Sequence, residues 1–302
     1  MAHDMPTEWL AGGTDLMERR RSGRSRGALL RLPEDARLSA ITWRADGGAT
    51  IGAGVTIATI AADARLIAAY PGLTAAAADL ATPEIREMAT LGGNIAQRTR
   101  CWYYRHTQAP CLKTGGSVCS ARRGNHLYGV AFDVGPCVAP HASTLATALI
   151  AYDAGITTNM RSFASVADIL GDGHDGTRDH QLAIGEWIAE IVLPPALANE
   201  RAKYHRAIGR AAAEWPLVEL VTCLSLDGTT IREARFAAGG IAPVPIRLTQ
   251  AEAALKGVAL AALPIQDVQR AALAGAKPLP MTGYKLALLQ GLIADALTEL
   301  GN

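Results

Sequence analysis

Apolar residues recur along the first two thirds of the chain at spacings that predict short strands alternating with helices. Apolar runs predict strands at Ala28–Leu32, Ala49–Ile57 and Glu186–Leu193, the last ended by Pro194 and Pro195. Helical spacing, with Thr56 as an N-cap for the first, predicts helices over Ile57–Ala69, Ser143–Ala154 (amphipathic) and Ser162–Leu170. Leu73–Met88 reads as a helix interrupted at Pro83, since proline lacks the donor that a helix interior requires.

The last third of the chain reads as strands followed by helices. Beyond a candidate boundary near residue 197, strand-like stretches come first, at Lys203–Ile208, Leu217–Leu226 and Thr230–Ala238. Helix-like segments follow, at Thr249–Lys256, Ile265–Ala274 and Gly283–Leu300. A run of strands and then a run of helices is typical of the α+β class. The length of 302 residues suits two modest domains, and we expect them at 1–197 and 198–302.

Two glycine-rich bends interrupt this pattern. They are Ala11-Gly12-Gly13-Thr14-Asp15 and Thr90-Leu91-Gly92-Gly93-Asn94. Glycine has no Cβ, so backbone N–H groups in such bends approach an anion closely and form an anion-binding nest. One Gly-Gly turn is usually only a turn, but two of them about 80 residues apart are able to grip a diphosphate from two sides. Neither fits the G-x-G-x-x-G or P-loop pattern.

Residues 98–140 show little periodicity and hold four of the five cysteines. These are Cys101, Cys111, Cys119 and Cys137, spaced C-x9-C-x7-C-x17-C. Thiolates are soft ligands suited to iron–sulfur clusters or zinc, whereas free cysteine also commonly sits in a core. The spacing leaves both interpretations open. Cys223 lies in an apolar run and reads as a core residue, and an odd count of five in a long chain argues against a disulfide framework.

Composition and charge exclude several classes of function. The formal charge of +1, without a basic stripe, argues against nucleic-acid binding, and no apolar run approaches the roughly 20 residues of a membrane span. Residues 1–10 show no export-signal design, so we expect a cytoplasmic protein or one exported with a signal-bearing partner. Charged residues make up only 19%, a weak indication of buried subunit contacts.

Other polar groups read as solvated. The arginine run at residues 19–26 reads as a helix end and loop, with a patch for an acidic partner or phosphate as the alternative. His174, Asp175, Asp179 and His180 lie among glycines and read as a solvated loop rather than a metal site. No nucleophile elbow or H-E-x-x-H motif occurs, and no paired carboxylates stand in a recognisable catalytic frame. The chain offers binding loops, as expected where chemistry belongs to cofactors.

The residues also resemble a known family. Both glycine bends, the strand Glu186–Pro194 and the stretch from Gly239-Gly240-Ile241-Ala242-Pro243 to Gly257 resemble the FAD-binding medium subunit of the xanthine dehydrogenase and carbon monoxide dehydrogenase family. The resemblance covers almost the whole chain. It implies an α+β protein with a two-subdomain FAD-binding domain of the vanillyl-alcohol oxidase type and a C-terminal domain of the CO dehydrogenase flavoprotein type. It also implies that residues 11–15 and 90–94 hold FAD.

The cysteine segment resembles one branch of that family, the periplasmic aldehyde oxidoreductases. The similar residues are Gln97–Arg105, Pro110-Cys111, Cys119 and Cys137–His141. In that branch the FAD subunit holds a [4Fe–4S] cluster, which by position implies Cys101, Cys111, Cys119 and Cys137 as its ligands. The resemblance further implies a large molybdenum–pterin subunit that oxidises an aldehyde or N-heterocycle, a small subunit with two [2Fe–2S] clusters, and an external electron acceptor.

Two departures from the family pattern change the expectation. Only ten residues precede the first bend, which predicts an FAD-binding half that is trimmed or completed by a neighbour. The family usually has an Asp shortly after the cysteine segment, and this chain has Thr144 at that position. Threonine would provide a hydroxyl toward the flavin but no charge. Two other functions stay as alternatives: a stand-alone FAD-dependent oxidoreductase of the same fold, and a cofactor-free assembly subunit.

Overall fold

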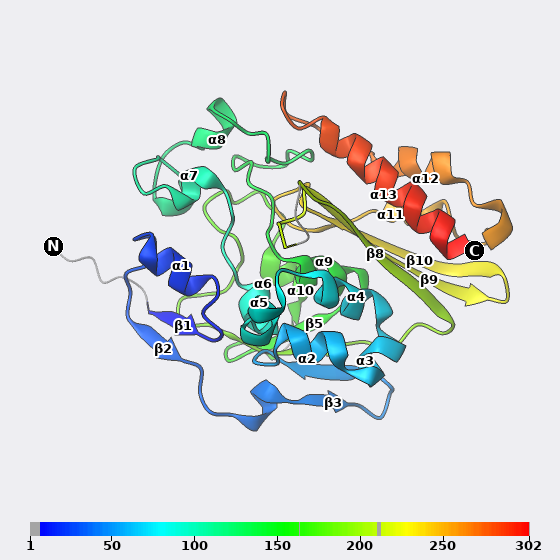
Figure 1. Ribbon diagram of the computed structural model, residues 1–302, viewed down its shortest axis with the longest axis horizontal. Helices are drawn as coiled ribbons and strands as arrows, with labels where there is room; N and C mark the ends of the chain where they lie inside the picture. Colours follow the sequence, from blue (N-terminus) through cyan, green and yellow to red (C-terminus); the bar gives the residue numbers. More distant parts are fainter. Residues whose placement is uncertain (1–6, 163, 210–212, 302) are drawn as a thin grey trace.

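The computed structural model describes residues 7–162, 164–209 and 213–301, and within them the α+β class is confirmed, with three separate sheets (Figure 1). The smallest is a parallel pair, β1 (Glu8–Leu10) and β2 (Leu29–Arg31), joined through helix α1 (Leu16–Arg21). Strand β1 lies in a stretch that reads as a polar start. Parallel pairing places the β1-to-α1 bend, residues 11–15, at one end of this unit.

A five-stranded antiparallel sheet forms the centre of the first domain. Its order is β3-β4-β7-β5-β6. The strands are β3 (Ile41–Trp43), β4 (Ala49–Gly52), β5 (Gly155–Thr158), β6 (Ala164–Ser165) and β7 (Ile188–Leu193), preceded by the 3-10 helix η1 (Ala36–Ser39). Strand β7 pairs with both β4 and β5, so segments far apart in sequence share one sheet. The predicted strand Ala49–Ile57 ends early, at Gly52.

Seven helices of the described residues pack in this domain. They are α2 (Ile57–Ala62), α3 (Ala64–Ala69), α4 (Pro71–Asp79), α5 (Pro83–Met88), α6 (Leu91–Ile95), α9 (Thr144–Ala151) and α10 (Val166–Leu170). Thr56 caps α2 as predicted. The predicted helix Ile57–Ala69 is wrong as a single helix, because the Asp63 carboxylate accepts the amides of Arg65 and Leu66 and starts a second one. Pro83 begins α5, which confirms the predicted interruption.

Two predicted helices take a different form. All eight residues of α9 are buried, so this helix packs against the protein on every side. The prediction of an amphipathic helix is wrong in that respect. The helix predicted over Ser162–Leu170 is instead strand β6 followed by α10, and residue 163 lies outside the described chain. The Ser165 hydroxyl and the Asp168 carboxylate form a capping box, which fixes the start of α10 at Val166.

Residues 98–140 form a largely irregular segment with three short helical pieces. These are α7 (Trp102–Arg105), η2 (Leu112–Thr114) and α8 (Ser120–Arg123), and the segment lies beside α1 in Figure 1. A small core of its own contains Ala121, Val130 and Val138. The backbone amides of Ala131 and Phe132 both donate to the carbonyl of Ile241, which ties the segment to the C-terminal part.

The C-terminal part is a four-stranded antiparallel sheet with helices on one face. Its order is β11-β10-β9-β8, from β8 (Glu200–Ala207), β9 (Val218–Asp227), β10 (Thr230–Gly239) and β11 (Ile246–Arg247). The helices are α11 (Thr249–Ala253), η3 (Leu260–Ala262), α12 (Ile265–Ala272) and α13 (Tyr284–Gly301). The strands and helices predicted beyond residue 197 are confirmed within a few residues at each end.

Strand β9 lies between the two hydrophobic cores. Its odd-numbered Val221 and Cys223 pack into the core of the first domain, together with α4 and α9. Its even-numbered Leu220 and Leu224 pack into the second core, under α13. The predicted core position of Cys223 is confirmed, and the double-sided burial explains its continuous apolar run. The limits 1–197 and 198–302 stay a prediction; residue 197 lies between β7 and β8.

Candidate cofactor-binding site

The first glycine bend has backbone N–H groups without acceptors and is half-buried. Gly13 has a φ of +74°, a left-handed conformation that glycine adopts readily. A Cβ on Gly12 would lie 1.7 Å from the carbonyl oxygen of Met88, so only glycine fits there. The N–H groups of residues 12–15 have no hydrogen-bond acceptor within the described chain. Consecutive free amides of this kind form an anion-binding concavity.

The second stretch is not a turn, because residues 91–95 form helix α6 with Thr90 as its N-cap. Its amides already have acceptors: Leu91 donates to Val55, Gly92 to Ala53, and Asn94 to Thr90. The amide of Gly93 donates to the Thr90 hydroxyl at 3.2 Å. The expectation of free amides in both bends is therefore wrong for the second. Gly92 serves packing instead, since a Cβ there would lie 2.7 Å from the Cβ of Ala53.

The two stretches nevertheless lie against each other. A Cβ on Gly93 would be 4.0 Å from the Cβ of Ala11, and Gly12 touches Met88 at the end of α5. A cavity of about 260 Å³ opens between them, and the predicted residues that line it are Thr14, Asp15, Gly93, Asn94 and Thr144. Arg100 and Arg206 add positive charge to its wall. The side-chain amide oxygen of Asn94 accepts from the Ser143 hydroxyl at 2.6 Å, which links α6 to α9.

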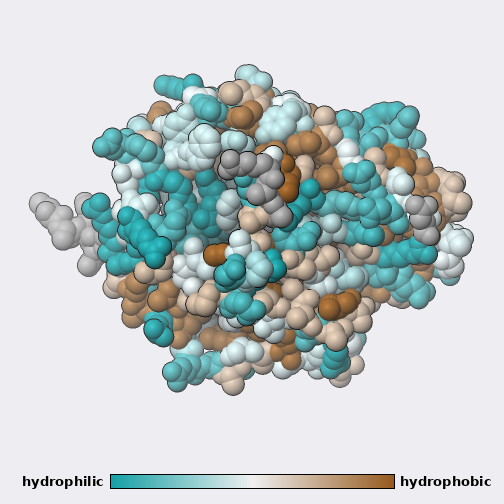
Figure 2. All heavy atoms as spheres, viewed as in Figure 1, coloured by the Kyte–Doolittle hydropathy of each residue, from teal (hydrophilic) through white to brown (hydrophobic). Residues whose placement is uncertain are grey.

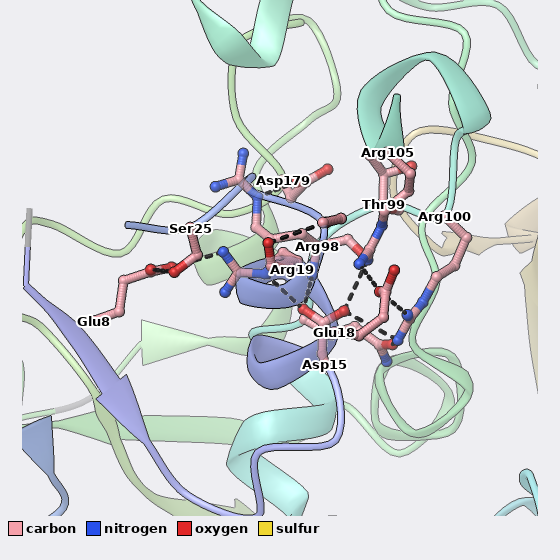
Figure 3. A network of polar contacts seen from close by, with 12 residues as sticks. Glu8, Asp15, Glu18, Arg19, Ser25, Arg98, Thr99, Arg100, Arg105 and Asp179 are labelled. Atoms are coloured by element: carbon pink, nitrogen blue, oxygen red, sulfur yellow. Dashed lines mark hydrogen bonds and ion pairs between the residues drawn. The ribbon is translucent and has the colours of Figure 1, made fainter. Parts of the chain in front are cut away.

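Asp15 binds arginines (Figure 3). Its carboxylate accepts from Arg19 Nε at 3.1 Å and Arg105 Nη2 at 2.8 Å, and forms an ion pair with Arg100 at 3.2 Å. Burial raises the pKa of Asp15, but the three arginines outweigh burial and hold that pKa below its usual value. The prediction of a solvated arginine run is wrong for Arg19, which is buried and also pairs with Glu8 at 2.6 Å. Figure 2 shows hydrophilic side chains gathered over α1.

Thr144 contacts a buried carboxyl. Its hydroxyl donates to Glu219 Oε2 at 2.8 Å, and the hydroxyls of Thr147 and Tyr204 donate to the same carboxyl at 2.8 and 2.9 Å. Burial raises the pKa of Glu219 above its ordinary value. Sequence reasoning missed Glu219 because it stands inside the apolar run of β9. The chain thus places a carboxyl behind Thr144, supplied by the C-terminal sheet.

Cys119 lies within electrostatic range of the other three cysteines of the irregular segment. The hydrogen bond from Cys137 lowers the pKa of Cys119 to about 5 although burial opposes this, whereas the same bond and burial both raise the pKa of Cys137. Cys111 and Cys119 lie close enough to Cys101 to raise its pKa electrostatically, and Cys119 likewise raises the pKa of Cys111. All five cysteines of the chain are free thiols.

Backbone N–H groups bond to every one of these four sulfurs. Donors are Tyr103 and Tyr104 to Cys101, Lys113 to Cys111, Ala121, Arg122 and Val138 to Cys119, and Ala139 to Cys137. Such bonds stabilise thiolates and are the usual surroundings of cluster-ligating sulfur. Among the residues that the structure describes, no set of three or more His, Cys, Asp or Glu side chains has metal-site spacing. The donor set and its amides still suit a thiolate-held cluster, with sulfurs that must draw together around it.

The polar loop near residue 179 is only partly solvated, contrary to prediction. His174 and Asp175 are exposed, but Asp179 pairs with Arg98 at 2.5 Å and with Lys113 at 3.0 Å. The two cations outweigh burial and hold the pKa of Asp179 far below its usual value. Asp179 therefore holds the cysteine segment through two ion pairs, with Arg98 before Cys101 in the sequence and Lys113 after it.

A second cavity of about 360 Å³ lies between the cysteine segment and the C-terminal part. Cys101, Trp102 and Tyr128 line one side, and Lys285 of α13 lines another. Arg100, Trp215 and Pro216 line both cavities, so the two adjoin. The Arg100 guanidinium stacks on Trp215 at 4.3 Å from the ring centroid.

Comparison with known proteins defines the class of this arrangement. Residues 1–196 match the family described as the FAD binding domain in molybdopterin dehydrogenase, and residues 203–300 match the CO dehydrogenase flavoprotein C-terminal domain. The chain therefore belongs to the FAD-binding medium subunits of the xanthine dehydrogenase and CO dehydrogenase family, whose members are subunits of molybdenum-dependent oxidoreductases. In the described residues, no helix is long and apolar enough to span a membrane.

Individual relatives agree with this assignment. The chain is 31% identical to the aldehyde oxidoreductase FAD-binding subunit of Escherichia coli strain K12, over 97% of this chain and 91% of that one. It is 23% identical to the xanthine dehydrogenase FAD-binding subunit of Escherichia coli O157:H7, over 99% and 90%.

Solved structures share the fold. Quinoline 2-oxidoreductase of Pseudomonas putida 86 aligns with a TM-score of 0.73 at 17% identity, over 98% of this chain and 89% of that one. Carbon monoxide dehydrogenase of Hydrogenophaga pseudoflava aligns with a TM-score of 0.72 at 21% identity, over 97% and 88%.

Proposed function

We propose that the 260 Å³ cavity between the first bend and α6 holds FAD, and that Cys101, Cys111, Cys119 and Cys137 hold a [4Fe–4S] cluster. The observation that carries this proposal is the convergence of the first bend and α6 on one cavity, near four cysteines whose sulfurs accept backbone N–H groups. When bound, the two groups would relay electrons that a partner subunit delivers. The chain would then be an electron-transfer subunit rather than the site of substrate oxidation.

The residues of the first bend suit the diphosphate of FAD. The N–H groups of residues 12–15 have no acceptor within the described chain and so are available to donate to it, and Thr14 and Asp15 line the cavity. The Asp15 carboxylate binds Arg19 and Arg105 and thereby holds the bend beside Arg100, whose guanidinium lines the cavity. Of the second stretch, Gly93 and Asn94 line the cavity, while Thr90 and Gly92 support them by capping and packing α6. Thr144 adds a hydroxyl that donates to Glu219.

The surroundings of the cysteines suit a cluster with net negative charge. Lys113 lies close enough to lower the pKa of Cys111 and Cys137, and the charge of Arg122 is felt by Cys119 and Cys137. Amide donors and nearby cations both stabilise added electrons on a thiolate-held centre. Each of these groups belongs to the cysteine segment itself, so the segment supplies both the ligands and their electrostatic environment.

The partners follow from the family. We propose a heterotrimer with a large molybdenum–pterin subunit and a small subunit carrying two [2Fe–2S] clusters, delivering electrons that leave to an external acceptor. The 31% identity to an aldehyde oxidoreductase FAD-binding subunit supports an aldehyde as substrate. The substrate pocket would lie on the large subunit.

The test is a cofactor inventory of the full chain purified anaerobically with its partners. We expect one FAD released per chain on denaturation, and a broad absorbance near roughly 400 nm typical of thiolate-ligated iron. Cys111→Ser should remove the iron of this subunit while leaving the flavin. Cys223→Ala is the matched control, because Cys223 is a core residue of β9. Unchanged iron in the Cys111→Ser protein would refute the ligand assignment, and a colourless preparation would refute the proposal as a whole.

A further inference from the structure

We propose that the 360 Å³ cavity beside Cys101 binds a quinone-class electron acceptor, which rests on the proposed function for the source of its electrons. The volume falls in the range of small-ligand pockets, roughly 300–1,000 Å³. The cavity is separate from the FAD cavity but adjoins it through Arg100, Trp215 and Pro216. A ligand here would lie between the cysteine segment and the flavin site.

The walls of this cavity suit a planar apolar ring. Trp102 and Tyr128 meet edge to face with their ring centroids 5.3 Å apart, and Trp215 lies across from Arg100 on the shared wall. Trp102 is 62% exposed and Tyr128 48%, although both are large aromatic side chains that proteins usually bury. Exposed aromatics at the rim of a hydrophobic pocket are a typical sign of ligand binding. The rim therefore offers stacking surfaces for a ring that enters from solvent.

Polar atoms on the same walls match the oxygens of a quinone and its quinol. Lys285 Nζ donates to the carbonyls of Gly240 at 2.7 Å and Tyr128 at 3.3 Å, which leaves one of its three N–H groups for a ligand. Arg100 Nε and His126 Nε2 are buried, and neither has a hydrogen-bond partner within the described chain. Because His126 Nδ1 lies 2.9 Å from the Gly124 carbonyl, Nδ1 carries the hydrogen and Nε2 is an acceptor. Lys285 and Arg100 would donate to quinone carbonyls, and His126 would accept from a quinol hydroxyl.

The electron balance of the proposed step is simple. The quinone would gain two electrons and two protons to become a quinol. Both electrons would come from the reduced flavin proposed for the adjoining cavity, which would return to its oxidised form. The protons come from solvent, which reaches the rim between Trp102 and Tyr128. Burial lowers the pKa of Lys285 to about 7, so this ammonium is also able to give up a proton near neutral pH.

The test measures binding rather than turnover. The oxidised full chain with its partners is titrated by equilibrium dialysis with duroquinone, whose ring has no free position for thiol addition. We expect one site per chain, and Trp102→Ala should weaken binding by about tenfold through lost stacking. Trp102→Phe keeps a ring and should restore most of the affinity. Trp187→Ala is the control, since that indole packs edge to face against Trp9 and lines neither cavity.

Three results would overturn the inference. Equal affinity for duroquinone in the wild-type and Trp102→Ala proteins would place the quinone elsewhere. Loss of bound FAD from the Trp102→Ala protein would show that the flavin ring itself occupies this cavity. Displacement of duroquinone by NAD⁺ would assign the cavity to a dinucleotide. Wild-type protein without flavin and iron would instead refute the proposed function, a different outcome from flavin-loaded protein that fails to bind duroquinone.

Discussion

The two glycine-rich stretches have nearly the same composition but opposite backbone states. In the first, the N–H groups of residues 12–15 have no acceptor within the described chain, and the bend is held from outside by arginines on Asp15. In the second, every amide from Leu91 to Asn94 has a partner, and the stretch is a short helix. Glycine thus serves ligand access in one stretch and close packing in the other. The difference depends on neighbours, here the carbonyls of Ala53 and Val55, which occupy the second set of amides.

The largest effect is expected from Gly12→Ala. The new methyl group would meet the Met88 carbonyl oxygen at 1.7 Å, and a backbone atom cannot move away as a side chain does. We expect a loss of about 3 kcal/mol or more in the free energy of unfolding, together with loss of bound FAD. Urea unfolding and flavin release measure the two quantities. Normal stability and full flavin content would mean that the two stretches do not touch as described.

Asp15→Asn should come next, because it removes the anion that three arginines share. Leaving Arg19, Arg100 and Arg105 without that charge should cost about 2–3 kcal/mol at neutral pH. The pKa of Asp15 is depressed in the folded state, so its contribution is present above about pH 4 and disappears as pH falls through the folded value. Urea unfolding at pH 7 and pH 3 should therefore show a gap between wild type and variant that closes in acid. A gap of constant size would mean that Asp15 acts by shape alone.

A smaller effect is expected from Gly92→Ala, and it should fall on stability rather than on flavin. The added methyl would lie 2.7 Å from the Ala53 Cβ, which overpacks the contact by about 1–3 kcal/mol. Because the Gly92 amide already donates to Ala53, flavin affinity should change little. Adding Ala53→Gly makes room and should restore most of the stability. A selective loss of flavin affinity would show that the second stretch also binds through its backbone.

The smallest effect is expected from Thr90→Ala. The Thr90 hydroxyl caps α6 by accepting the Gly93 amide, and such a cap contributes about 1 kcal/mol. Ser165→Ala, which removes the cap of α10, is the control and should cost a similar amount. Thermal unfolding of both variants tests the equivalence. A much larger loss in the Thr90→Ala protein would mean that its hydroxyl has a second role at the cavity.

Sequence patterns predicted what depends on local order. The long strands and helices beyond residue 197, the interruption at Pro83 and the cap at Thr56 all follow from spacing and single-residue conformational preferences. The four cysteines were recognised as a set because they share an aperiodic segment, whereas their assignment as cluster ligands came from resemblance and stays a prediction. The prediction that the two glycine-rich stretches bind FAD came from the family resemblance. A Gly-Gly pair alone does not distinguish a bend from the first turn of a helix.

What the sequence did not reveal depends on residues that are distant along the chain. Glu219 is hidden in the apolar run of β9 and becomes significant only where α9 brings Thr144 and Thr147 to it. Asp179 reads as solvated until Arg98 and Lys113 approach from another segment. The glycine pair lies inside helix α6 because Val55 and Ala53, in the turn between β4 and α2, supply carbonyls to the amides of Leu91 and Gly92. Each of these is a tertiary contact that no local pattern records.

Strand β9 has side chains in both hydrophobic cores, so the two parts of the subunit are expected to fold and unfold together. A polypeptide severed near residue 197 would leave the upstream fragment without Val221 and Cys223, so neither fragment has a finished interior. We therefore expect one sigmoidal melting curve for the entire subunit, where two independent folding units would give two. Evolutionary exchange of only one half between relatives would then require matching substitutions on the odd-numbered side of this strand.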